Sequence, residues 1–464
     1  MTQSGHTLLC DLIWRKDLSF VSRVTGASAR AGRSVYRGAR AGVNKLKNLS
    51  RQKAYRYEEP APGTLFSQKA QYERLHQGES PSEVFSGDIE LRRAAKVPAF
   101  TVIMAVSEPR PDRFEDSMIS VLSQTWAGFE FIVADCGMKS AVGNVLADYD
   151  DDRIRHFRMQ GMANVSDALN SAALHASGDY IVFLDYGDLL TQDALFETAL
   201  TIMATGAEIL YSDEDCCDSA MRKFSSPYFK PDFNKDYLFA SPYITHMLVI
   251  RRELFLALRF RSRFDGARDY DLILRAPKSG ICHVPRVLYH VRRLPERKST
   301  SGDARAALEN YFSVRGLRAR VTQEGGSAFL HVDYLPDIFT VRKEIGIIGG
   351  KVLDRRRRII GGMMDEDGSV AFEGLDEIDP GHQRGAVTVR NADAVDARCM
   401  RIRPELYGLY QEVFGTSYST PMRGRAYEIR EKSLQFCERA RAKGYLILWD
   451  PAMTVSVRGR RSTE

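Results

Sequence analysis

Acidic side chains follow three apolar, strand-like runs of this sequence. The runs and the acids after them are Phe129–Ala134 with Asp135, Tyr180–Leu184 with Asp185, and Ile209–Tyr211 with Asp213, Glu214 and Asp215. Ligands of open α/β sheets bind beyond the carboxyl ends of the strands, so these acids would share one edge. The sequence contains neither G-x-G-x-x-G nor G-x-x-x-x-G-K-[ST], the glycine loops that bind phosphate through backbone amides. An acidic edge needs a bridging cation to bind a diphosphate, and we therefore expect a diphosphate site assisted by Mg²⁺ or Mn²⁺.

Alternating strand-like and helical stretches would position these acids. The expected strands are Phe100–Val106, Phe129–Ala134, Ile154–Met159, Tyr180–Leu184 and Ile209–Tyr211, and the expected helices are Asp112–Gln124, Val165–Ala176 and Asp193–Ala204. The order of these elements predicts βαβ units, and hence an α/β fold with a mostly parallel, Rossmann-like sheet.

Composition excludes several classes of protein. With 464 residues, 44% hydrophobic and 27% charged, the chain has the profile of a globular protein of two to four domains and not of a disordered or fibrous one. We find no apolar run of about 18 residues and no signal-peptide pattern in residues 1–14, and we expect a cytoplasmic location. Seven cysteines without a C-x-x-C pair indicate neither a disulfide framework nor a zinc site.

The positive charge is concentrated near the N-terminus. Residues 15–56 contain twelve Lys and Arg residues and one acid, Asp17, giving +11, whereas the whole chain carries +6. Leu8, Leu12, Phe20 and Val24 recur at multiples of four, which would give residues 1–56 an amphipathic character. This arm would lie peripherally on an anionic membrane surface, such as the inner face of the plasma membrane, or it would pack on the body beside a solvated linker. We expect no nucleic acid, because no motif that reads bases accompanies the charge.

From Phe100 to His290 the sequence resembles family 2 glycosyltransferases of the GT-A fold, in the branch that builds O-antigen and rhamnan-type surface polysaccharides. The motifs that carry the resemblance are Phe100-Thr-Val-Ile-Met-Ala, Ser120-Val-Leu-Ser-Gln-Thr, Phe129-Glu-Phe-Ile-Val-Ala-Asp135, Gly178-Asp-Tyr-Ile-Val-Phe-Leu-Asp185, Tyr211-Ser-Asp-Glu-Asp215, Lys230-Pro-Asp232, His246, Asp269-Tyr-Asp271-Leu and Val287-Leu-Tyr-His290. The resemblance implies transfer of a sugar from a nucleotide-diphosphate sugar, with inversion at the anomeric carbon.

The resemblance also implies roles for individual residues. Asp269 matches the family's base and would take the proton of the acceptor hydroxyl, with Asp271 in the same catalytic motif. The donor-binding matches are Asp135, which would hold the nucleotide base, Asp185 and Asp188 of the D-x-D region, and Asp213 and Asp215. The implied metal ligands are Asp185, Asp188 and His290, and the acceptor-side candidates are Lys230, Asp232 and His246.

The sequence departs from the family's pattern at three places around the expected nucleotide pocket. The usual Asp-x-Asp-Asp reads Asp185-Tyr-Gly-Asp188, so Gly187 replaces the usual metal-binding Asp. Cys136 and Ser107 replace an Asp and an Asn of the pattern. These departures leave open a second hypothesis, in which the domain retains the fold as a catalytically impaired scaffold or partner subunit in a polysaccharide assembly complex.

The C-terminal residues resemble the acceptor half of a second, truncated GT-A-like module, an α+β region. Asp337–Val341 would be the remnant of its first strand, and the positions expected for its base motif are Ser433 and Gln435. Leu308–Arg320 would form a helix between the modules, and Arg355–Arg358 a hairpin turn. The predicted divisions are an arm at 1–56, a connector at 57–97, a GT-A domain at 98–300, a linker helix and strand at 301–340, and a degenerate half-module at 341–464.

Taken together, these features predict a glycosyltransferase that acts on a glycan or lipid-linked glycan at the cytoplasmic face of the membrane. The nucleotide, the sugar and the linkage have no signature in the sequence.

Overall fold

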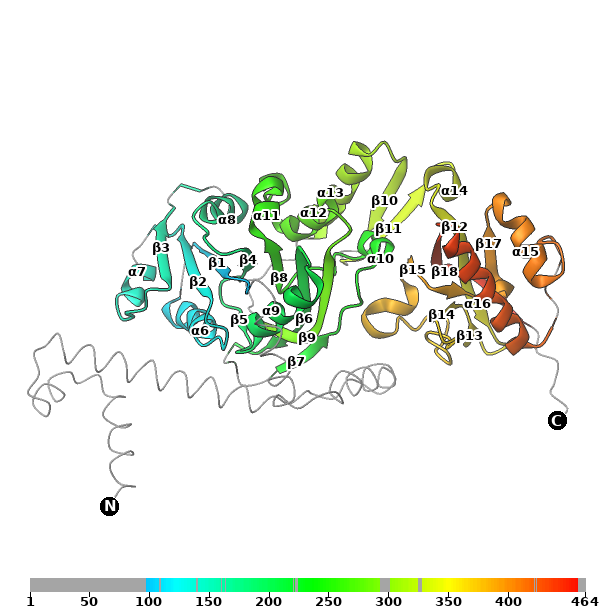
Figure 1. Cartoon of the computed structure of the whole chain (residues 1–464), viewed down its shortest axis with the longest axis horizontal. Coiled ribbons are helices and arrows are strands. Elements are labelled where there is room, and N and C mark those ends of the chain that lie inside the picture. The colour runs from blue at the N-terminus through cyan, green and yellow to red at the C-terminus, as the bar shows by residue number, and fades with distance from the viewer. Residues whose placement is uncertain are drawn as a thin grey trace, which may run out of the picture.

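A computed structural model of the chain describes residues 97–457, apart from 108–109, 139–140, 160, 163, 220, 222–223, 293–300, 324–327, 421 and 423. The predicted arm at 1–56 and nearly all of the predicted connector at 57–97 lie outside the described residues. Two regions lie side by side: a larger one that runs from blue to green in Figure 1, and a smaller one that runs from yellow to red.

The larger region is built on a mixed sheet of nine strands. They are β1 (Phe100–Val106), β2 (Phe129–Asp135), β3 (Ile154–Arg158), β4 (Tyr180–Phe183), β5 (Leu189–Leu190), β6 (Ile209–Cys217), β7 (Phe224–Tyr228), β8 (Leu248–Arg251) and β9 (Ile281–Arg292). Their order is β3-β2-β1-β4-β8-β6-β9-β5, with β7 paired to β6. Strands β3, β2, β1 and β4 are parallel, and β6 and β9 run in the same direction as these four. The expected α/β class and the mostly parallel sheet are confirmed.

Strand β8 is antiparallel to both of its neighbours, β4 and β6. Its amino end therefore lies at the same edge as the carboxyl ends of β4 and β6. Because of this reversal, the residues just before β8 lie at the same edge as the residues just after β4.

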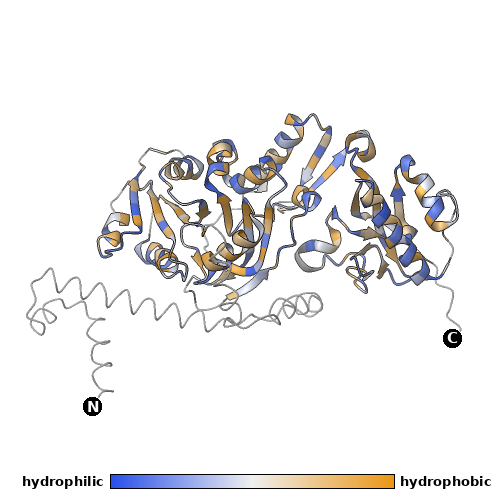
Figure 2. Ribbon diagram, viewed as in Figure 1, coloured by the Kyte–Doolittle hydropathy of each residue, from blue (hydrophilic) through white to orange (hydrophobic). Residues whose placement is uncertain are grey.

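Helices cover both faces of this sheet. The helices are α6 (Pro111–Leu122), α7 (Ala141–Leu146), α8 (Val165–Ala173), α9 (Ala194–Thr205), α10 (Lys235–Ala240), α11 (Arg252–Leu258), α12 (Arg268–Arg275) and α13 (Ser301–Val314), with a 3₁₀ segment, η1, at Ser262–Ala267. Val102 and Met104 of β1 belong to the core cluster that α6, α7 and α9 complete, whereas Ile103 belongs to the cluster with α8, α11, α12 and α13. Successive strand residues point to opposite faces, so continuous apolar runs such as Phe100–Val106 are buried on both sides, and Figure 2 shows these strands coloured as hydrophobic.

The predicted helix at Leu308–Arg320 is α13, which begins and ends earlier than expected. Strands β10 (Ala319–Gln323) and β11 (Leu330–Tyr334) follow it and form an antiparallel pair. The strand predicted at Asp337–Val341 is wrong. The Asp337 carboxylate accepts from the backbone N–H of Phe339 at 2.9 Å, and this cap starts the short helix α14 (Ile338–Val341).

The C-terminal region is an α+β unit on a five-stranded sheet. Its elements are β12 (Ile345–Leu353), β13 (Ile359–Gly361), β14 (Met363–Met364), η2 (His382–Val387), β15 (Arg390–Asn391), β16 (Ala394–Val395), η3 (Ala397–Cys399), β17 (Met400–Ile402), η4 (Pro404–Leu406), α15 (Tyr407–Phe414), α16 (Ala426–Ala442) and β18 (Leu446–Ser456). Strands β12 and β18 are parallel, and β13, β15 and β17 run antiparallel to their neighbours. Residues 354–358 form the turn between β12 and β13, closed by the hydrogen bond from Asp354 N to Arg358 O, so the predicted hairpin turn at Arg355–Arg358 is confirmed.

Within the described part of the chain, every helix is too short or too polar to cross a bilayer.

Candidate active site

Six charged side chains make a continuous series of contacts at the edge of the sheet where the carboxyl ends of β4 and β6 meet. We refer to this series as the ion-pair chain, and its signs alternate. The contacts are Lys230 Nζ to Glu214 Oε2 at 2.9 Å, Glu214 Oε2 to His246 Nδ1 at 3.1 Å, His246 Nε2 to Asp185 Oδ2 at 3.6 Å, Asp185 Oδ1 to Arg268 Nη2 at 2.6 Å, and Arg268 Nε to Asp269 Oδ1 at 4.0 Å. Three predicted classes of residue, for donor, acceptor and catalysis, thus meet in one place.

The topology explains this meeting. Asp185 comes just after β4, and Glu214 lies on β6, on the far side of β8. His246 precedes the antiparallel β8 and therefore lies at the same edge, between the other two. Helix α12 begins with Arg268 and Asp269 at this edge, so sequence segments more than 80 residues apart contact one another.

The turn at 185–188 is held from β9. The hydroxyl of Tyr289 accepts from the Asp185 backbone N–H at 3.1 Å and donates to Asp188 Oδ2 at 2.9 Å. The other Asp188 oxygen accepts from the backbone N–H of Arg292 at 2.9 Å, and Asp188 is fully buried. The ring of His246 stacks on Tyr289, with centroids 4.6 Å apart. Asp188 therefore fixes the shape of the turn beneath Asp185.

The two residues in the middle of the ion-pair chain, Glu214 and His246, have shifted pKa values. Burial raises the pKa of Glu214, but Lys230 and His246 outweigh it and hold this pKa well below its ordinary value. Burial lowers the pKa of His246, but Glu214 and Asp185 outweigh it and raise this pKa to about 10. The raised pKa favours the protonated form of His246, which lies in the series between the basic side chains of Lys230 and Arg268.

Asp269 is the end of the ion-pair chain and is 16% exposed. Burial raises the pKa of its carboxyl above the ordinary value, although Arg268 opposes the rise. A carboxylate with a raised pKa is a stronger base than an ordinary one, and its partial exposure leaves it open to a hydroxyl group. These properties suit the base that the sequence predicted at this position.

The carboxylate of Asp271 pairs with arginines outside the ion-pair chain. Its buried carboxylate pairs with Arg261 and, at 2.9 Å, with Arg275. Residues two positions apart on a helix do not face each other, so Asp271 points away from Asp269. The predicted catalytic role of Asp271 has no support in this geometry, which instead gives it a structural role.

The group able to hold a metal differs from the predicted one. Among the described residues, ligand atoms of Asp185, Asp188 and His246 lie within 4.8 Å of one another. His290, predicted in this group, instead bonds Asp215 through Nδ1 at 2.6 Å, because the β6–β9 register sets these two residues opposite each other. The donor set fits a divalent cation poorly as it stands, since Asp185 pairs with Arg268, Asp188 is buried and bonded through both oxygens, and His246 contacts the carboxylates of Glu214 and Asp185.

Asp213 and Asp215 lie within β6, which runs to Cys217 and not only to Tyr211 as predicted. Asp213 accepts from the backbone N–H of Lys230 at 2.8 Å and contacts His283 Nε2 at 2.9 Å. The other ring nitrogen of His283 lies 3.2 Å from Asp232, whose side chain is exposed. Asp213 thus contacts the backbone of Lys230, and Glu214 is the acid of β6 whose carboxylate belongs to the ion-pair chain.

Asp135 ends β2 at the same edge, two strands from Asp185. It is fully buried and binds His156 Nε2 at 3.1 Å and Arg158 Nη1 at 2.9 Å, and it accepts from the backbone N–H of Gly137 at 3.0 Å. Both of its oxygens are bonded to the protein.

Two residues of this site, Arg268 and Tyr289, were missed as site residues, and Glu214 was named among the acids of the edge but was given no role. Strand alternation carries a signal for Glu214, because within a strand it faces the side opposite to Asp213 and Asp215. Arg268 stands beside the predicted base, but only the fold brings it to Asp185. Tyr289 carried no signal beyond its place in an apolar strand.

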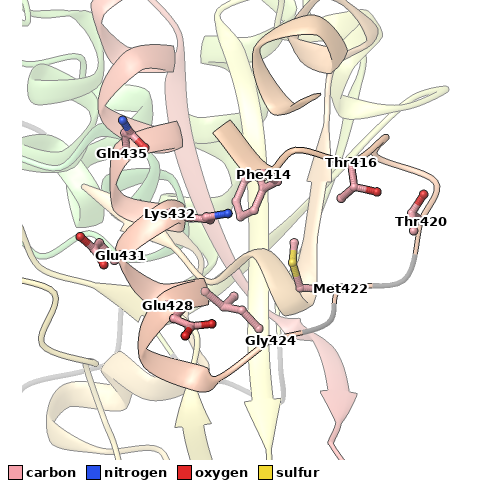
Figure 3. A pocket seen from close by; sticks show the side chains of 10 residues that line it. Phe414, Thr416, Thr420, Met422, Gly424, Glu428, Glu431, Lys432 and Gln435 are labelled. Atoms are coloured by element: carbon pink, nitrogen blue, oxygen red, sulfur yellow. The ribbon is translucent and has the colours of Figure 1, made fainter. Parts of the chain in front are cut away.

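A cavity of about 600 Å³ lies in the C-terminal region between the end of α15 and the first part of α16. Figure 3 shows Lys432 pointing from α16 toward Phe414 across it. Gln435, at the position expected for a second base, lines this cavity, whereas Ser433 is buried and donates to Ile429 O at 2.7 Å. Neither side chain can serve as a carboxylate base.

Part of the chain is similar to known proteins. Residues 101–258, about a third of the chain, match glycosyl transferase family 2. The chain is 30% identical to the O-antigen biosynthesis protein RfbC of Myxococcus xanthus over 58% of its own length and 21% of that protein's. It is 28% identical to the amylovoran biosynthesis glycosyltransferase AmsB of Erwinia amylovora over 38% of its own length and 66% of that enzyme's. The chain therefore spans only part of the relatives it matches.

Among solved structures, TarS of Staphylococcus aureus in complex with UDP-GlcNAc is similar at 16% identity and a TM-score of 0.38, over 46% of this chain and 66% of that one.

Proposed function

We propose that the family 2 glycosyltransferase domain at residues 101–258, completed by α12 and β9, transfers a sugar from a nucleotide-diphosphate sugar to a surface-polysaccharide acceptor. The observation that carries this proposal is the position of Asp269, a partly exposed carboxylate with a raised pKa at the edge that also presents Asp185. A GT-A type of fold and inversion at the anomeric carbon belong to the proposal.

In the proposed reaction Asp269 takes the proton of the acceptor hydroxyl. The hydroxyl oxygen then forms a bond to the anomeric carbon of the donor, and the bond from that carbon to the diphosphate breaks with its electron pair on the diphosphate oxygen. Positive charge near the departing diphosphate stabilises this step, and the ion-pair chain brings the basic side chains of Lys230, His246 and Arg268 to the edge. The products are the extended glycan, the nucleoside diphosphate and one proton on Asp269.

The names of two relatives, an O-antigen biosynthesis protein and an amylovoran biosynthesis glycosyltransferase, support a glycan acceptor of the bacterial surface. Such an acceptor is carried on a lipid, and the basic arm at 1–56 would then hold the enzyme at an anionic membrane surface. This role of the arm remains a prediction, because the arm lies outside the described residues.

One observation favours a second candidate, a non-catalytic scaffold. Gly187 stands where the family has a metal-binding Asp, and the neighbouring carboxylates already have partners. A scaffold would bind a glycan or a protein of the assembly machinery and would not turn over a nucleotide sugar.

The test combines donor binding with donor turnover. Calorimetric titration with UDP, dTDP and GDP and their sugars identifies a donor, and the appearance of free nucleoside diphosphate as the sugar passes to water or an acceptor measures turnover. Asp269→Asn should bind the donor as the wild type does. It should form free nucleoside diphosphate at least about 100-fold more slowly, because only the base is lost. The matched control Asp333→Asn, an exposed Asp on β11, should change neither quantity. Unchanged turnover by Asp269→Asn would remove Asp269 as the base, and a folded wild type that binds no donor would favour the scaffold.

A further inference from the structure

The turn at 185–188 is built around the glycine that replaces the expected metal ligand. Gly187 has a φ of +91°, and the turn is closed by the hydrogen bond from Asp188 N to Asp185 O at 3.1 Å. The backbone N–H of Gly187 also donates to the Ser117 hydroxyl at 3.2 Å. An L-residue at this φ costs about 1–3 kcal/mol, so the backbone itself, and not only the missing side chain, disfavours a carboxylate at position 187.

The oxygens that remain near the turn are committed to protein partners. Asp185 Oδ1 lies 2.6 Å from Arg268 Nη2, and both oxygens of the buried Asp188 accept hydrogen bonds at 2.9 Å. Mg²⁺ and Mn²⁺ bind through one or two carboxylates that are free to turn toward them. A cation bound through Asp185 Oδ1 would have to displace the guanidinium of Arg268.

Arg268 is placed where such a cation would act. Its guanidinium lies between Asp185, the expected donor-side acid, and Asp269, the proposed base. It is 16% exposed, and its Nε–H is buried and has no hydrogen-bond acceptor among the described residues. A guanidinium has five N–H donors, and its planar fork matches two oxygens of a phosphate group.

Two further basic side chains, Lys230 and His246, lie along the ion-pair chain beyond Asp185. Lys230 is buried against Glu214, and His246 lies between Glu214 and Asp185. Glu214 and Asp185 balance these charges in the described state, so an arriving diphosphate would meet one guanidinium that can exchange a carboxylate partner for phosphate oxygens.

We propose that Arg268 binds the diphosphate of the nucleotide donor and neutralises the charge that develops on it, in the place of a tightly bound divalent cation. This inference rests on the proposed function and adds to that function the group that holds the leaving diphosphate. The step needs no co-reactant, because the electron pair of the broken bond stays on the diphosphate oxygen and Arg268 donates hydrogen bonds to the diphosphate without losing a proton.

The experiment is calorimetric titration of the full chain with UDP, dTDP and GDP, each in EDTA and in Mn²⁺. For the wild type we expect saturable binding of one nucleotide in EDTA, with an affinity that Mn²⁺ leaves within about two-fold. Arg268→Gln should weaken this binding in EDTA by about 10- to 100-fold, since a charge-assisted pair of hydrogen bonds is lost. Arg268→Lys keeps the positive charge but loses the planar fork of N–H donors. Its nucleotide affinity in EDTA should lie between those of the wild type and Arg268→Gln. The control Arg251→Gln removes an exposed arginine that pairs with Glu208 and should bind as the wild type does.

A metal titration of the variant gives a second, independent result. In Arg268→Gln the carboxylate of Asp185 loses its guanidinium, so Mn²⁺ should restore part of the nucleotide affinity to this variant while leaving the wild type unchanged. Circular dichroism on each variant verifies the fold.

Two outcomes would overturn the inference and leave the proposed function standing: wild-type binding that appears only with Mn²⁺, or Arg268→Gln binding in EDTA as tightly as the wild type. A folded wild type that binds none of the three nucleotides in either condition would overturn both.

Discussion

The side chain of Asn391 on β15 forms two hydrogen bonds with Asp236 on α10. Its Nδ2 donates to Asp236 Oδ2 at 2.7 Å, and its Oδ1 accepts from the Asp236 backbone N–H at 3.1 Å. The backbone of Asn391 bonds Asn234, and Arg342 pairs with the same Asp236 carboxylate at 2.8 Å. The C-terminal region is therefore joined to the short segment between Lys230 and His246, two members of the ion-pair chain.

Asn391→Ala should lower both stability and activity. Asp236 is almost fully buried, and the substitution removes the partner of its backbone N–H and one of two partners of its Oδ2, which keeps Arg342 Nη2 at 3.3 Å, at a cost of about 1–3 kcal/mol. Urea denaturation measures this loss, and donor turnover should fall because the segment that carries Lys230 and His246 loses a support. Asn310→Ala, which removes an exposed side chain bonded to Arg263, is the control and should alter neither. Full stability of Asn391→Ala would mean that the junction does not depend on this residue.

The pH dependence of turnover should report Asp269. Burial raises the pKa of this carboxyl, and the base must be ionised to act, so kcat/KM should fall as the pH falls through a value above the ordinary Asp pKa of about 4. Residual activity of Asp269→Asn should lack this acidic limb. A profile measured with saturating and with limiting donor separates the free enzyme from the complex. An acidic limb that persists unchanged in the variant would assign it to another group.

Asp271 should prove structural. Its buried carboxylate pairs with Arg261 and Arg275, so Asp271→Asn leaves two guanidinium groups without their charge partner and should destabilise the fold by about 3–5 kcal/mol. Urea denaturation of the wild type and the variant measures the loss. A variant as stable as the wild type but without turnover would restore Asp271 as a catalytic candidate.

His283 should give the fold a pH-dependent contribution. Burial lowers its pKa, but Asp213 and Asp232 outweigh this and raise it, so protonation of His283 is more favourable in the folded chain. This part of the stability is fully present below the unfolded His pKa of about 6.5 and is lost as the pH rises through the higher folded value. His283 also lowers the pKa of Asp232, which adds stability above the unfolded Asp value of about 4.

The difference in unfolding free energy between the wild type and His283→Asn should therefore be largest between roughly pH 4 and 6.5 and should shrink above that window. Urea denaturation across this range measures it. A difference that does not vary with pH would show that His283 is neutral in the folded chain.

The strands and helices of the larger region could be predicted from sequence, because their apolar periodicity reflects burial on both faces of a sheet. The predicted Phe100–Val106 is β1 without change, and Phe129–Ala134 and Tyr180–Leu184 differ from β2 and β4 by one residue. The apolar run at 209–211 did not reveal that β6 continues through six further residues with three acids among them, since polar residues at the end of a strand have the composition of a turn. A short apolar segment such as 338–341 is compatible with either a helix or a strand. The cap that Asp337 provides starts the helix.

For the site, the sequence by itself determined which edge would carry the acids, because parallel strands bring their carboxyl ends together. It also determined Asp269 as the base candidate and Gly187 as the departure from the family pattern. Only the tertiary structure decided which residues face one another. The reversal of β8 brings His246 to Asp185, alternation along β6 selects Glu214, and the start of α12 places Arg268 against Asp185, 83 positions away. These contacts depend on strand direction and register between distant segments, which local periodicity does not record.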